Sequence, residues 1–456
     1  MTNSVNTREL VLGILLEITE EEQYSHIALR SALDKYQYLS KQDRAFITRI
    51  TEGTIEYMTQ IDYIINQFSS VKVENMKPLI RGLIRSAVYQ MKYMDNVPNS
   101  AVCNEAVKIA QKRGFYKLKG FVNGVIRAIG RDLDTVEFPK EEDSVITYLS
   151  VTYSMPEWLV EKWVKQFGVD ITKIMLQDFL ENKPTSIRVN LQKSNVAQVT
   201  QSLIMQGITV KEAPYLDYAL YISDYNYMRG IQAFRDGLFQ IQDVSSMLVA
   251  EIAAPKWGDY VIDVCAAPGG KSLHIADKLK GSGHVEARDL TDSKVAFIQE
   301  NITKNDVINM TAVAKDATVF DIKSIEKADI MIADVPCSGF GVIGKKTDIK
   351  YKMSQKKQAD LVELQRKILD TVHTYVKVGG TLIYSTCTID ADENQGNMKW
   401  FLENYPYKME SLDPYIPDEL KSKTTRIGFM QLLPGVHRTD GFFIARLKRI
   451  GQGVRS

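Results

Sequence analysis

The sequence predicts a multidomain protein with an all-α N-terminal part, a small α+β middle part and a doubly wound α/β C-terminal part. Three observations lead to this prediction. Apolar residues recur at helical spacing through residues 1–131. Helical and strand patterns alternate between residues 145 and 240. From residue 241 onward, short apolar strands alternate with longer helical stretches, which is typical of a parallel sheet covered by helices.

The composition is that of a globular protein and excludes several classes of function. The 456 residues carry 57 Lys and Arg against 56 Asp and Glu, so the formal net charge is +1, and 45% are hydrophobic. The four cysteines are scattered without a C-x-x-C pair, so we expect no metal site and no disulfide scaffold, but a reducing cytoplasm. No apolar run approaches the roughly 18 residues that span a bilayer, so no membrane partner is expected.

The four expected segments follow from these patterns. A helical domain is expected over residues 1–131, a linker over 132–144, a small α+β domain over 145–240 and a larger α/β domain over 241–450. The linker is rich in acidic residues, poor in aliphatic ones and contains Pro139. The helical patterns of the first two domains cover residues 10–16, 46–55, 61–68, 79–91, 106–129, 156–167 and 196–205, and strand patterns cover 185–191 and 218–222.

The α/β domain contains five expected strands, and the residues that follow them are the candidate site. The strands cover residues 260–265, 284–290, 311–315, 329–334 and 381–385, with helices at 273–279, 294–302 and 358–376. In such a sheet a ligand binds beyond the carboxyl ends of the strands. If the sheet has the usual order, the first, fourth and fifth of these strands are neighbours.

A glycine-containing loop follows the first of these strands, where residues 263–272 read DVCAAPGGKS. A P-loop would need a glycine where Cys265 stands, and a G-x-G-x-x-G fingerprint is absent. Asp289 and Asp316 end the next two strands, and a carboxylate in the position of Asp289 can accept hydrogen bonds from ribose hydroxyls. This combination favours S-adenosylmethionine over NAD or ATP. The expected cofactor-binding residues are Cys265, Ala266, Ala267, Pro268, Gly269, Gly270, Lys271, Asp289, Asp316 and Asp334.

Two of the four cysteines follow the last two strands. The fourth strand runs into DVPCS, which contains Cys337, and the fifth into YSTCT, which contains Cys387. C5 of cytosine becomes nucleophilic when a thiolate adds to C6, and it then attacks a sulfonium methyl group. Asp334 is placed to contact N3 of the base during this addition. A second cysteine nearby can assist the release of the product.

These motifs resemble those of the RNA cytosine-5 methyltransferases of the NOL/NOP/Sun type. The resemblance lies in residues 263–271, 334–337 and 385–387, with further blocks at 188–190 (RVN), 242–246 (QDVSS) and 440–443 (DGFF). The N-terminal part is similar to the NusB-like helical domain in residues 39–45, 97–106 and 119–123. The combination resembles bacterial small-subunit (16S) ribosomal RNA methyltransferases. One departure is the segment 344–349 (GKKTDI), where relatives commonly carry arginines and proline.

The resemblance implies an RRM-like middle domain, a Rossmann-like catalytic domain and a specific reaction. A methyl group would pass from S-adenosylmethionine to C5 of a cytosine in 16S ribosomal RNA through a covalent cysteine–C6 adduct. Cys387 would be the nucleophile and Cys337 would help to release the product.

RNA binding is expected from basic residues that contact phosphates. Residues 106–131 contain seven basic residues and no acidic one, and a second basic cluster (residues 345, 346, 350 and 352) follows Cys337. The expected RNA-binding residues are Lys108, Lys112, Arg113, Lys117, Lys119, Lys345 and Lys346. Two alternatives compete with the methyltransferase: a nucleotide-hydrolysing RNA factor using residues 269–272, and a non-catalytic RNA-binding or antitermination protein. The second alternative has no use for the pair of thiols.

Overall fold

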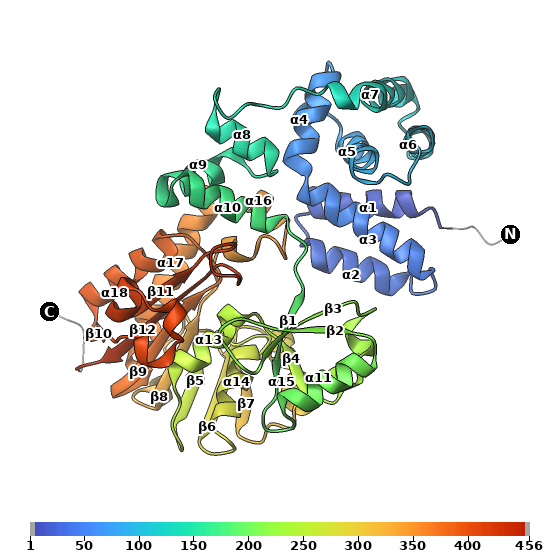
Figure 1. Cartoon of the computed structure of the whole chain (residues 1–456). Helices are drawn as coiled ribbons and strands as arrows, with labels where there is room; N and C mark the ends of the chain where they lie inside the picture. The colour runs from blue at the N-terminus through green and yellow to red at the C-terminus, as the bar shows by residue number, and fades with distance from the viewer. Residues whose placement is uncertain (1–4, 452–456) are drawn as a thin grey trace. The chain divides into compact units, whose positions relative to one another are not determined.

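The computed structural model describes residues 5–451 and divides into two compact units (Figure 1). The first unit comprises Met1–Glu181 together with Ile343–Lys352, and the second comprises Asn182–Val342 together with Met353–Ser456. This division differs from the four expected segments, because residues 145–181 belong to the first unit. Residues 1–4 of the expected helical domain lie outside the described residues. Among the described residues, no helix is long and apolar enough to cross a membrane.

The first unit is helical, as the sequence predicts. Its main core is formed by aliphatic side chains of the first seven helices, and buried residues of α5 lie at its centre. The helices are α1 (Thr7–Thr19), α2 (Ser25–Lys35), α3 (Lys41–Glu56), α4 (Met58–Phe68), α5 (Pro78–Tyr93), α6 (Asn99–Lys112), α7 (Lys119–Asp132), α8 (Val145–Thr152), α9 (Glu157–Phe167), α10 (Val169–Phe179) and the short α16 (Ile349–Lys352).

The single helix expected over residues 106–129 is wrong, because the structure contains two helices there. α6 ends at Lys112, and Gly114 adopts a left-handed conformation with φ of 87°. The N–H of Phe115 donates to the carbonyl of Ala110 at 2.8 Å, which closes the end of the helix. The helical spacing of apolar residues continues across the break, so the periodicity alone did not reveal it.

The second unit begins with a small antiparallel sheet, which confirms the expected α+β pattern. The strands β1 (Thr185–Val189), β2 (Thr209–Glu212), β3 (Ala219–Ser223) and β4 (Phe239–Ile241) form a sheet with the order β2-β3-β1-β4. The helix α11 (Val196–Met205) contributes buried residues to the core of this sheet, and the short α12 (Gln232–Arg235) lies between β3 and β4 in the sequence.

A larger, mostly parallel sheet follows, and its order confirms the expected neighbours. The order is β10-β12-β9-β8-β5-β6-β7, with β11 paired to β12. The strands are β5 (Tyr260–Asp263), β6 (His284–Asp289), β7 (Met310–Ala314), β8 (Ala328–Asp334), β9 (Val376–Thr386), β10 (Tyr407–Met409), β11 (Phe429–Leu432) and β12 (Phe442–Arg449). β5, β8 and β9, the first, fourth and fifth expected strands, are adjacent and parallel. β12 is antiparallel to β9.

Helices cover both faces of this sheet (Figure 1). One core contains residues of α13 (Val244–Ala253), α14 (Gly270–Lys278) and α15 (Asp292–Lys304). The other contains residues of α17 (Gln355–Val372) and α18 (Asn397–Asn404). Near the C-terminus lies the short α19 (Lys423–Ile427). This layering is a doubly wound α/β arrangement, and it confirms the predicted fold class of this part of the chain.

The segment Ile343–Lys352, which follows the Cys337 loop, packs within the first unit. The buried carboxylate of Asp348 accepts hydrogen bonds from the backbone N–H and the Oγ of Ser25, at 2.9 and 2.7 Å. The Nζ of Lys350 donates to the carbonyls of Glu56 and Ser154 at 2.8 and 2.7 Å. Lys350 is 2% exposed, so its expected membership in the RNA-binding cluster is wrong. This lysine binds the protein's own backbone instead.

The buried Lys350 predicts a pH-dependent stability. Burial lowers the pKa of Lys350 from 10.5 to about 7. Between these values the unfolded chain binds a proton that the folded chain lacks, so the contribution of Lys350 to the free energy of unfolding rises with pH. The rise amounts to about 4 kcal/mol at 1.36 kcal/mol per pH unit. We therefore measure the free energy of unfolding of Lys350→Met and of wild type in urea. From pH 7 to pH 10 we expect the variant to become progressively less stable relative to wild type.

The exposed Lys346 supplies the matched control for this measurement. Lys346→Met removes an exposed lysine from the same segment and shows the effect of losing a lysine that is not buried. A difference between Lys350→Met and wild type that does not change with pH would show that Lys350 does not titrate in this range.

Candidate functional site

The two cysteines predicted to carry the chemistry lie together. Cys337 follows β8 and Cys387 follows β9, and their Sγ atoms are 3.4 Å apart. The register explains this proximity: β8 and β9 are parallel, and Asp334 pairs with Ser385 in the ladder. Cys337 is therefore three residues beyond this pair on its strand, and Cys387 is two residues beyond it. Both are free thiols of intermediate exposure.

Hydrogen bonds join three chain segments next to the two cysteines. The N–H of Gly341 donates to the carbonyl of Cys387 at 3.0 Å, and the N–H of Gly441 donates to the carbonyl of Gly341 at 2.9 Å. A Cβ added to Gly341 would lie 1.8 Å from the carbonyl oxygen of Gly441, so only glycine fits there. The hydroxyls of Ser338 and Thr388 form a further hydrogen bond of 2.7 Å. Residues 440–443, singled out in the sequence, thus hold the cysteine loops in place.

A half-buried ion pair lies beside the cysteines. The Nζ of Lys271 is 2.6 Å from Oδ2 of Asp334, whose Oδ1 accepts a hydrogen bond from Ser385 Oγ at 2.8 Å. Burial alone would lower the pKa of Lys271, but Asp334 and, more weakly, Cys387 raise it above its ordinary value. The lysine therefore remains a cation that favours a thiolate on Cys387. The sequence placed Lys271 in the cofactor loop and did not foresee this ion pair.

Cys337 and Cys387 differ in their surroundings. The hydrogen bond to Cys387, followed by burial, raises the pKa of Cys337 well above its ordinary value. Cys337 therefore keeps its proton and can donate it to the sulfur of Cys387. Lys271 and the Cys337 thiol together provide two groups that stabilise a negative charge on Cys387.

The glycine loop lies between β5 and α14 and is held by two carboxylates. Oδ2 of Asp289, at the end of β6, accepts a hydrogen bond from the N–H of Ala267 at 2.9 Å, and its Oδ1 is 3.0 Å from the Nζ of Lys294. Asp263, at the end of β5, accepts a hydrogen bond from Ser272 Oγ at 2.6 Å. Burial raises the pKa of Asp263 to about 7. Asp263 therefore fixes the first turn of α14 rather than facing a ligand.

Asp316 and Cys265 lie at the same edge of the sheet. Asp316 follows β7, and its Oδ1 accepts hydrogen bonds from the N–H and Oγ1 of Thr318, which lower the pKa of its carboxyl group. Cys265 follows β5, and burial followed by the charge of Asp263 raises the pKa of its thiol.

The site also contains residues that the sequence did not indicate. Glu393 is buried, and its Oε2 accepts hydrogen bonds from the N–H of Ser338 at 2.9 Å and from Nε2 of Gln365 at 2.8 Å. The same Nε2 donates to the carbonyl of Pro336 at 2.8 Å. Glu393 and Gln365 thus hold the peptides on both sides of Cys337. The two residues lie 28 positions apart in sequence, and no motif connects them.

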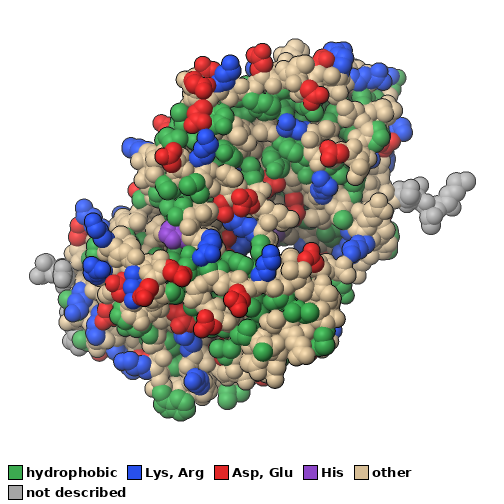
Figure 2. Space-filling view, viewed as in Figure 1, with side chains coloured by type: hydrophobic (Ala, Val, Ile, Leu, Met, Phe, Trp, Pro, Cys, Tyr) green, Lys and Arg blue, Asp and Glu red, His purple; other side chains and the backbone are tan. Residues whose placement is uncertain are grey.

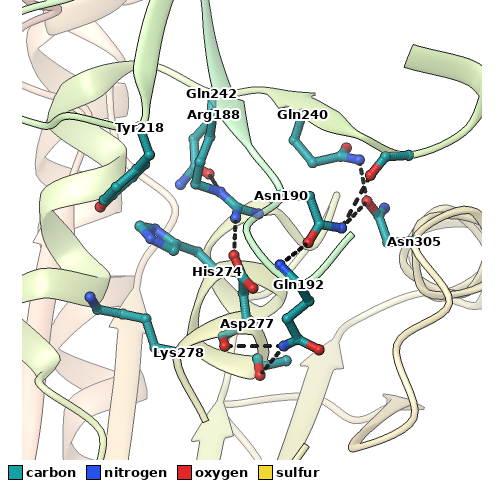
Figure 3. A network of polar contacts seen from close by, with 12 residues as sticks. Arg188, Asn190, Gln192, Tyr218, Gln240, Gln242, His274, Asp277, Lys278 and Asn305 are labelled. Carbon is teal, nitrogen blue, oxygen red and sulfur yellow. Dashed lines mark hydrogen bonds and ion pairs between the residues drawn. The ribbon is translucent and has the colours of Figure 1, made fainter. Parts of the chain in front are cut away.

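The RVN and QDVSS blocks connect the small sheet to the helix α14, which packs on the larger sheet (Figure 3). Arg188, on β1, is 2% exposed; its Nε donates to Gln242 at 2.9 Å and its Nη1 is 3.0 Å from the carboxylate of Asp277 on α14. Gln192 donates to the carbonyl of Asp277 at 3.0 Å. These contacts give the blocks a structural role. A cavity of about 800 Å³ lined by Tyr218 and Asp277, among others, lies beside this network.

Comparisons with known proteins identify the family of the chain. The family model for the 16S rRNA methyltransferase RsmB/F matches residues 250–448, the NusB family matches 5–131, and a ferredoxin-like domain of RsmF/B-like methyltransferases matches 155–227. The probable ribosomal RNA small subunit methyltransferase B of Bacillus subtilis (strain 168) is 35% identical over 453 residues, covering 98% of this chain and 99% of the relative. The chain belongs to the ribosomal RNA small subunit methyltransferase B family.

This membership confirms the predicted family, the NusB-like N-terminal part and the enzymatic class. The corresponding protein of Synechocystis sp. is 30% identical and covers 98% of this methyltransferase and 100% of the relative. The solved structure of PH0851 is 25% identical, covers 98% of this chain and 99% of its own, and superposes with a TM-score of 0.81. NSun6 from Pyrococcus horikoshii, solved with SFG, shares the fold over 65% of this chain and 99% of its own, with a TM-score of 0.58 and 24% identity.

The predicted RNA-binding residues of this methyltransferase lie on the surface of the first unit. Lys112 and Arg113, at the end of α6, lie 2.6 and 3.7 Å from the carboxylate of Glu9, and Lys108 lies 2.9 Å from Glu105. Lys and Arg side chains are interspersed with Asp and Glu over the face that Figure 2 shows. The absence of acidic residues from 106–131 therefore does not produce an unopposed basic surface, because other segments supply carboxylates. Lys117, Lys345 and Lys346 are exposed, and Lys119 is half-buried.

Proposed function

We propose that the protein transfers the methyl group of S-adenosylmethionine to C5 of one cytosine in 16S ribosomal RNA through a covalent bond between Cys387 and C6. The observation that supports this most directly is the 3.4 Å separation of the two cysteine sulfurs beside the Lys271–Asp334 ion pair. Family membership establishes a small-subunit ribosomal RNA methyltransferase. The base and the chemical route are our proposal.

Each side chain of the site has a separate part in this reaction. Cys387 adds to C6 as a thiolate, favoured by the cation of Lys271 and the thiol of Cys337. The developing charge on the ring requires a proton or hydrogen bond at N3. Asp334, which shares a hydrogen bond with the ammonium of Lys271, supplies this contact. After methyl transfer C5 still carries a proton, and Cys337 assists its removal so that the C6–S bond breaks and Cys387 leaves.

The glycine loop fits the methyl donor by the chemistry of its groups. The loop 265–270 presents backbone N–H groups between β5 and α14, and the carboxylate of Asp289 at the end of β6 retains lone pairs for ribose hydroxyls. S-adenosylmethionine, when bound, supplies an electrophilic methyl group. Cys265, Lys271, Asp289 and Asp316 would hold it, and Asp334 borders both it and the target base. The base has to leave its stack in the RNA to reach this depth.

Bisulfite sequencing of 16S ribosomal RNA tests the proposed reaction. We expect one protected cytosine in the parent strain to become unprotected when the gene is deleted, and to be protected again when the gene is restored. A gene that encodes Cys387→Ala should fail to restore it. An unchanged pattern of protected cytosines after deletion, together with the loss of a methyl group at another base or atom by mass spectrometry, would contradict the proposal.

The predicted RNA-binding residues are tested by the salt dependence of RNA binding. Lys117→Gln combined with Lys119→Gln is expected to reduce the slope of log Kd against log salt concentration by about 1.4 to 1.8, because each lost phosphate contact contributes about 0.7 to 0.9. The matched control is Lys72→Gln, because Lys72 is an exposed lysine of the same unit that is not among the predicted RNA-binding residues. An unchanged slope in the double variant would remove this surface from the binding site.

A further inference from the structure

Glu393 has an unusual environment for a carboxylate. It lies in the turn Asp392–Gly396, shortly after Cys387, and is fully buried. Its Oε2 accepts two hydrogen bonds, from the N–H of Ser338 and from Gln365, whereas its Oε1 is buried with no hydrogen-bond partner among the described residues. An unpaired buried oxygen destabilises a fold and is uncommon in native proteins. Its retention beside the cysteine loop points to a use in the reaction.

The protonation states around Glu393 are coupled to the chemistry. Burial raises the pKa of Glu393, which makes the carboxylate a better proton acceptor than an exposed one. The pKa of Cys337 is raised first by its hydrogen bond to Cys387 and also, more weakly, by the charge of Glu393. Cys337 is therefore a thiol in the resting enzyme, and a thiol cannot remove the C5 proton. When the sulfur of Cys387 becomes bonded to C6, its negative charge is gone, and the largest reason for Cys337 to keep its proton disappears.

We propose that Glu393 accepts the proton of Cys337 once the covalent adduct has formed, and so converts Cys337 into the base that releases the product. The inference rests on the proposed function above. In the resting structure the thiol of Cys337 is hydrogen-bonded to Cys387 and makes no hydrogen bond to Glu393. Once the adduct has formed, the thiol turns away from Cys387 and its proton passes from Sγ to Oε1 of Glu393. The resulting thiolate takes the proton from C5. The electron pair of the C5–H bond forms the C5–C6 double bond. The electron pair of the C6–S bond returns to Cys387 as a thiolate. Glu393 then loses its proton to water as the RNA departs.

The geometry supports a role through Cys337 rather than on the substrate. The carboxylate of Glu393 accepts a hydrogen bond from the N–H of Ser338, and Gln365 donates both to this carboxylate and to the carbonyl of Pro336. These bonds keep the carboxyl group beside the Cys337 peptide throughout the cycle. Asn397 and Tyr384 bind the backbone carbonyl of Glu393, at 3.1 and 2.6 Å, and so hold the turn without using its carboxylate. Glu393 is thus a positioning and proton-accepting residue whose effect appears at product release.

The test separates the first turnover from the following ones. In Glu393→Gln, which keeps the size and an acceptor oxygen, we expect wild-type rates of methyl transfer with enzyme in excess over RNA. Under multiple turnover we expect kcat to fall about 100-fold, the lower end of the range for general acid–base assistance, with accumulation of a covalent protein–RNA complex on denaturing gels. Glu393→Asp, which keeps the charge, should recover part of the release rate. The exposed Asp392 on the same turn provides the control Asp392→Asn, which should behave as wild type.

The outcomes distinguish this inference from the proposed function. A Glu393→Gln variant that is slow already in the first turnover, or that has a lowered unfolding midpoint and no trapped complex, has only a structural defect, and the inference is then wrong. The inference also fails if Cys337→Ala traps a covalent complex while Glu393→Gln turns over normally, and in that case the proposed function stands. If no complex forms in Cys337→Ala, the adduct itself is wrong. For the wild-type protein, decay of the preformed complex should slow as the pH falls, because protonated Glu393 cannot accept the proton.

Discussion

Replacing Cys387 with alanine is expected to reduce methyl transfer to 16S ribosomal RNA by more than about 10³-fold. Without a thiolate at C6, C5 of cytosine remains part of an aromatic ring and does not attack the methyl donor, so the covalent route is lost. The remaining binding and electrostatic groups, including Lys271 and Asp334, do not create a nucleophile at C5. The measurement is incorporation of a labelled methyl group into purified ribosomal RNA, with RNA affinity determined in parallel.

The chain offers a matched control for this substitution. Cys103 is a buried thiol in α6 whose Sγ lies 3.3 Å from Asn123, in the first unit and outside the site. Cys103→Ala should retain the wild-type rate. Activity of Cys387→Ala above about a tenth of wild type would contradict the assignment of the nucleophile, and an inactive Cys337→Ala that forms no adduct would then transfer that role to Cys337.

Replacing Cys337 with alanine is expected to have the second large effect, the accumulation of a covalent protein–RNA complex. Cys387 can still add to C6 and the methyl group can still be transferred. The variant lacks the thiol of Cys337, whose Sγ lies 3.4 Å from that of Cys387 and assists release. We expect most of the enzyme to be trapped after one turnover, as a slowly migrating band on denaturing gels that carries one labelled methyl group. Steady-state turnover should fall by about 10² or more, the effect of one general acid–base group.

The double variant Cys337→Ala with Cys387→Ala is the control for this experiment, because it retains the cofactor loop and lacks the sulfur that forms the adduct. It should give no trapped band. A band of equal intensity in the double variant would mean that another side chain reacts with the RNA.

The fold and part of the site were predictable because their signals are local. Apolar periodicity identified most helices of the first unit, but not α2, α8 and α10, and it identified the central strands of the second unit. The ends of β8 and β9 were placed within a few residues of Cys337 and Cys387. The break between α6 and α7 was missed because it depends on one backbone conformation at Gly114. The strands β10–β12 were also missed, since β10 and β11 are short and β12 is antiparallel and defined by its pairing with β9.

The sequence by itself determined which chemical groups this methyltransferase possesses and their order along the strands. A loop of small residues, carboxylates at strand ends and two Pro-Cys and Thr-Cys motifs are local features, and a parallel sheet brings strand ends to one edge. Only the tertiary structure decided what each group contacts. Lys350 binds backbone carbonyls, Glu9 neutralises Lys112, and Glu393 lies behind Cys337. Charge and protonation depend on neighbours within a few ångströms, and residues distant in sequence supply those neighbours.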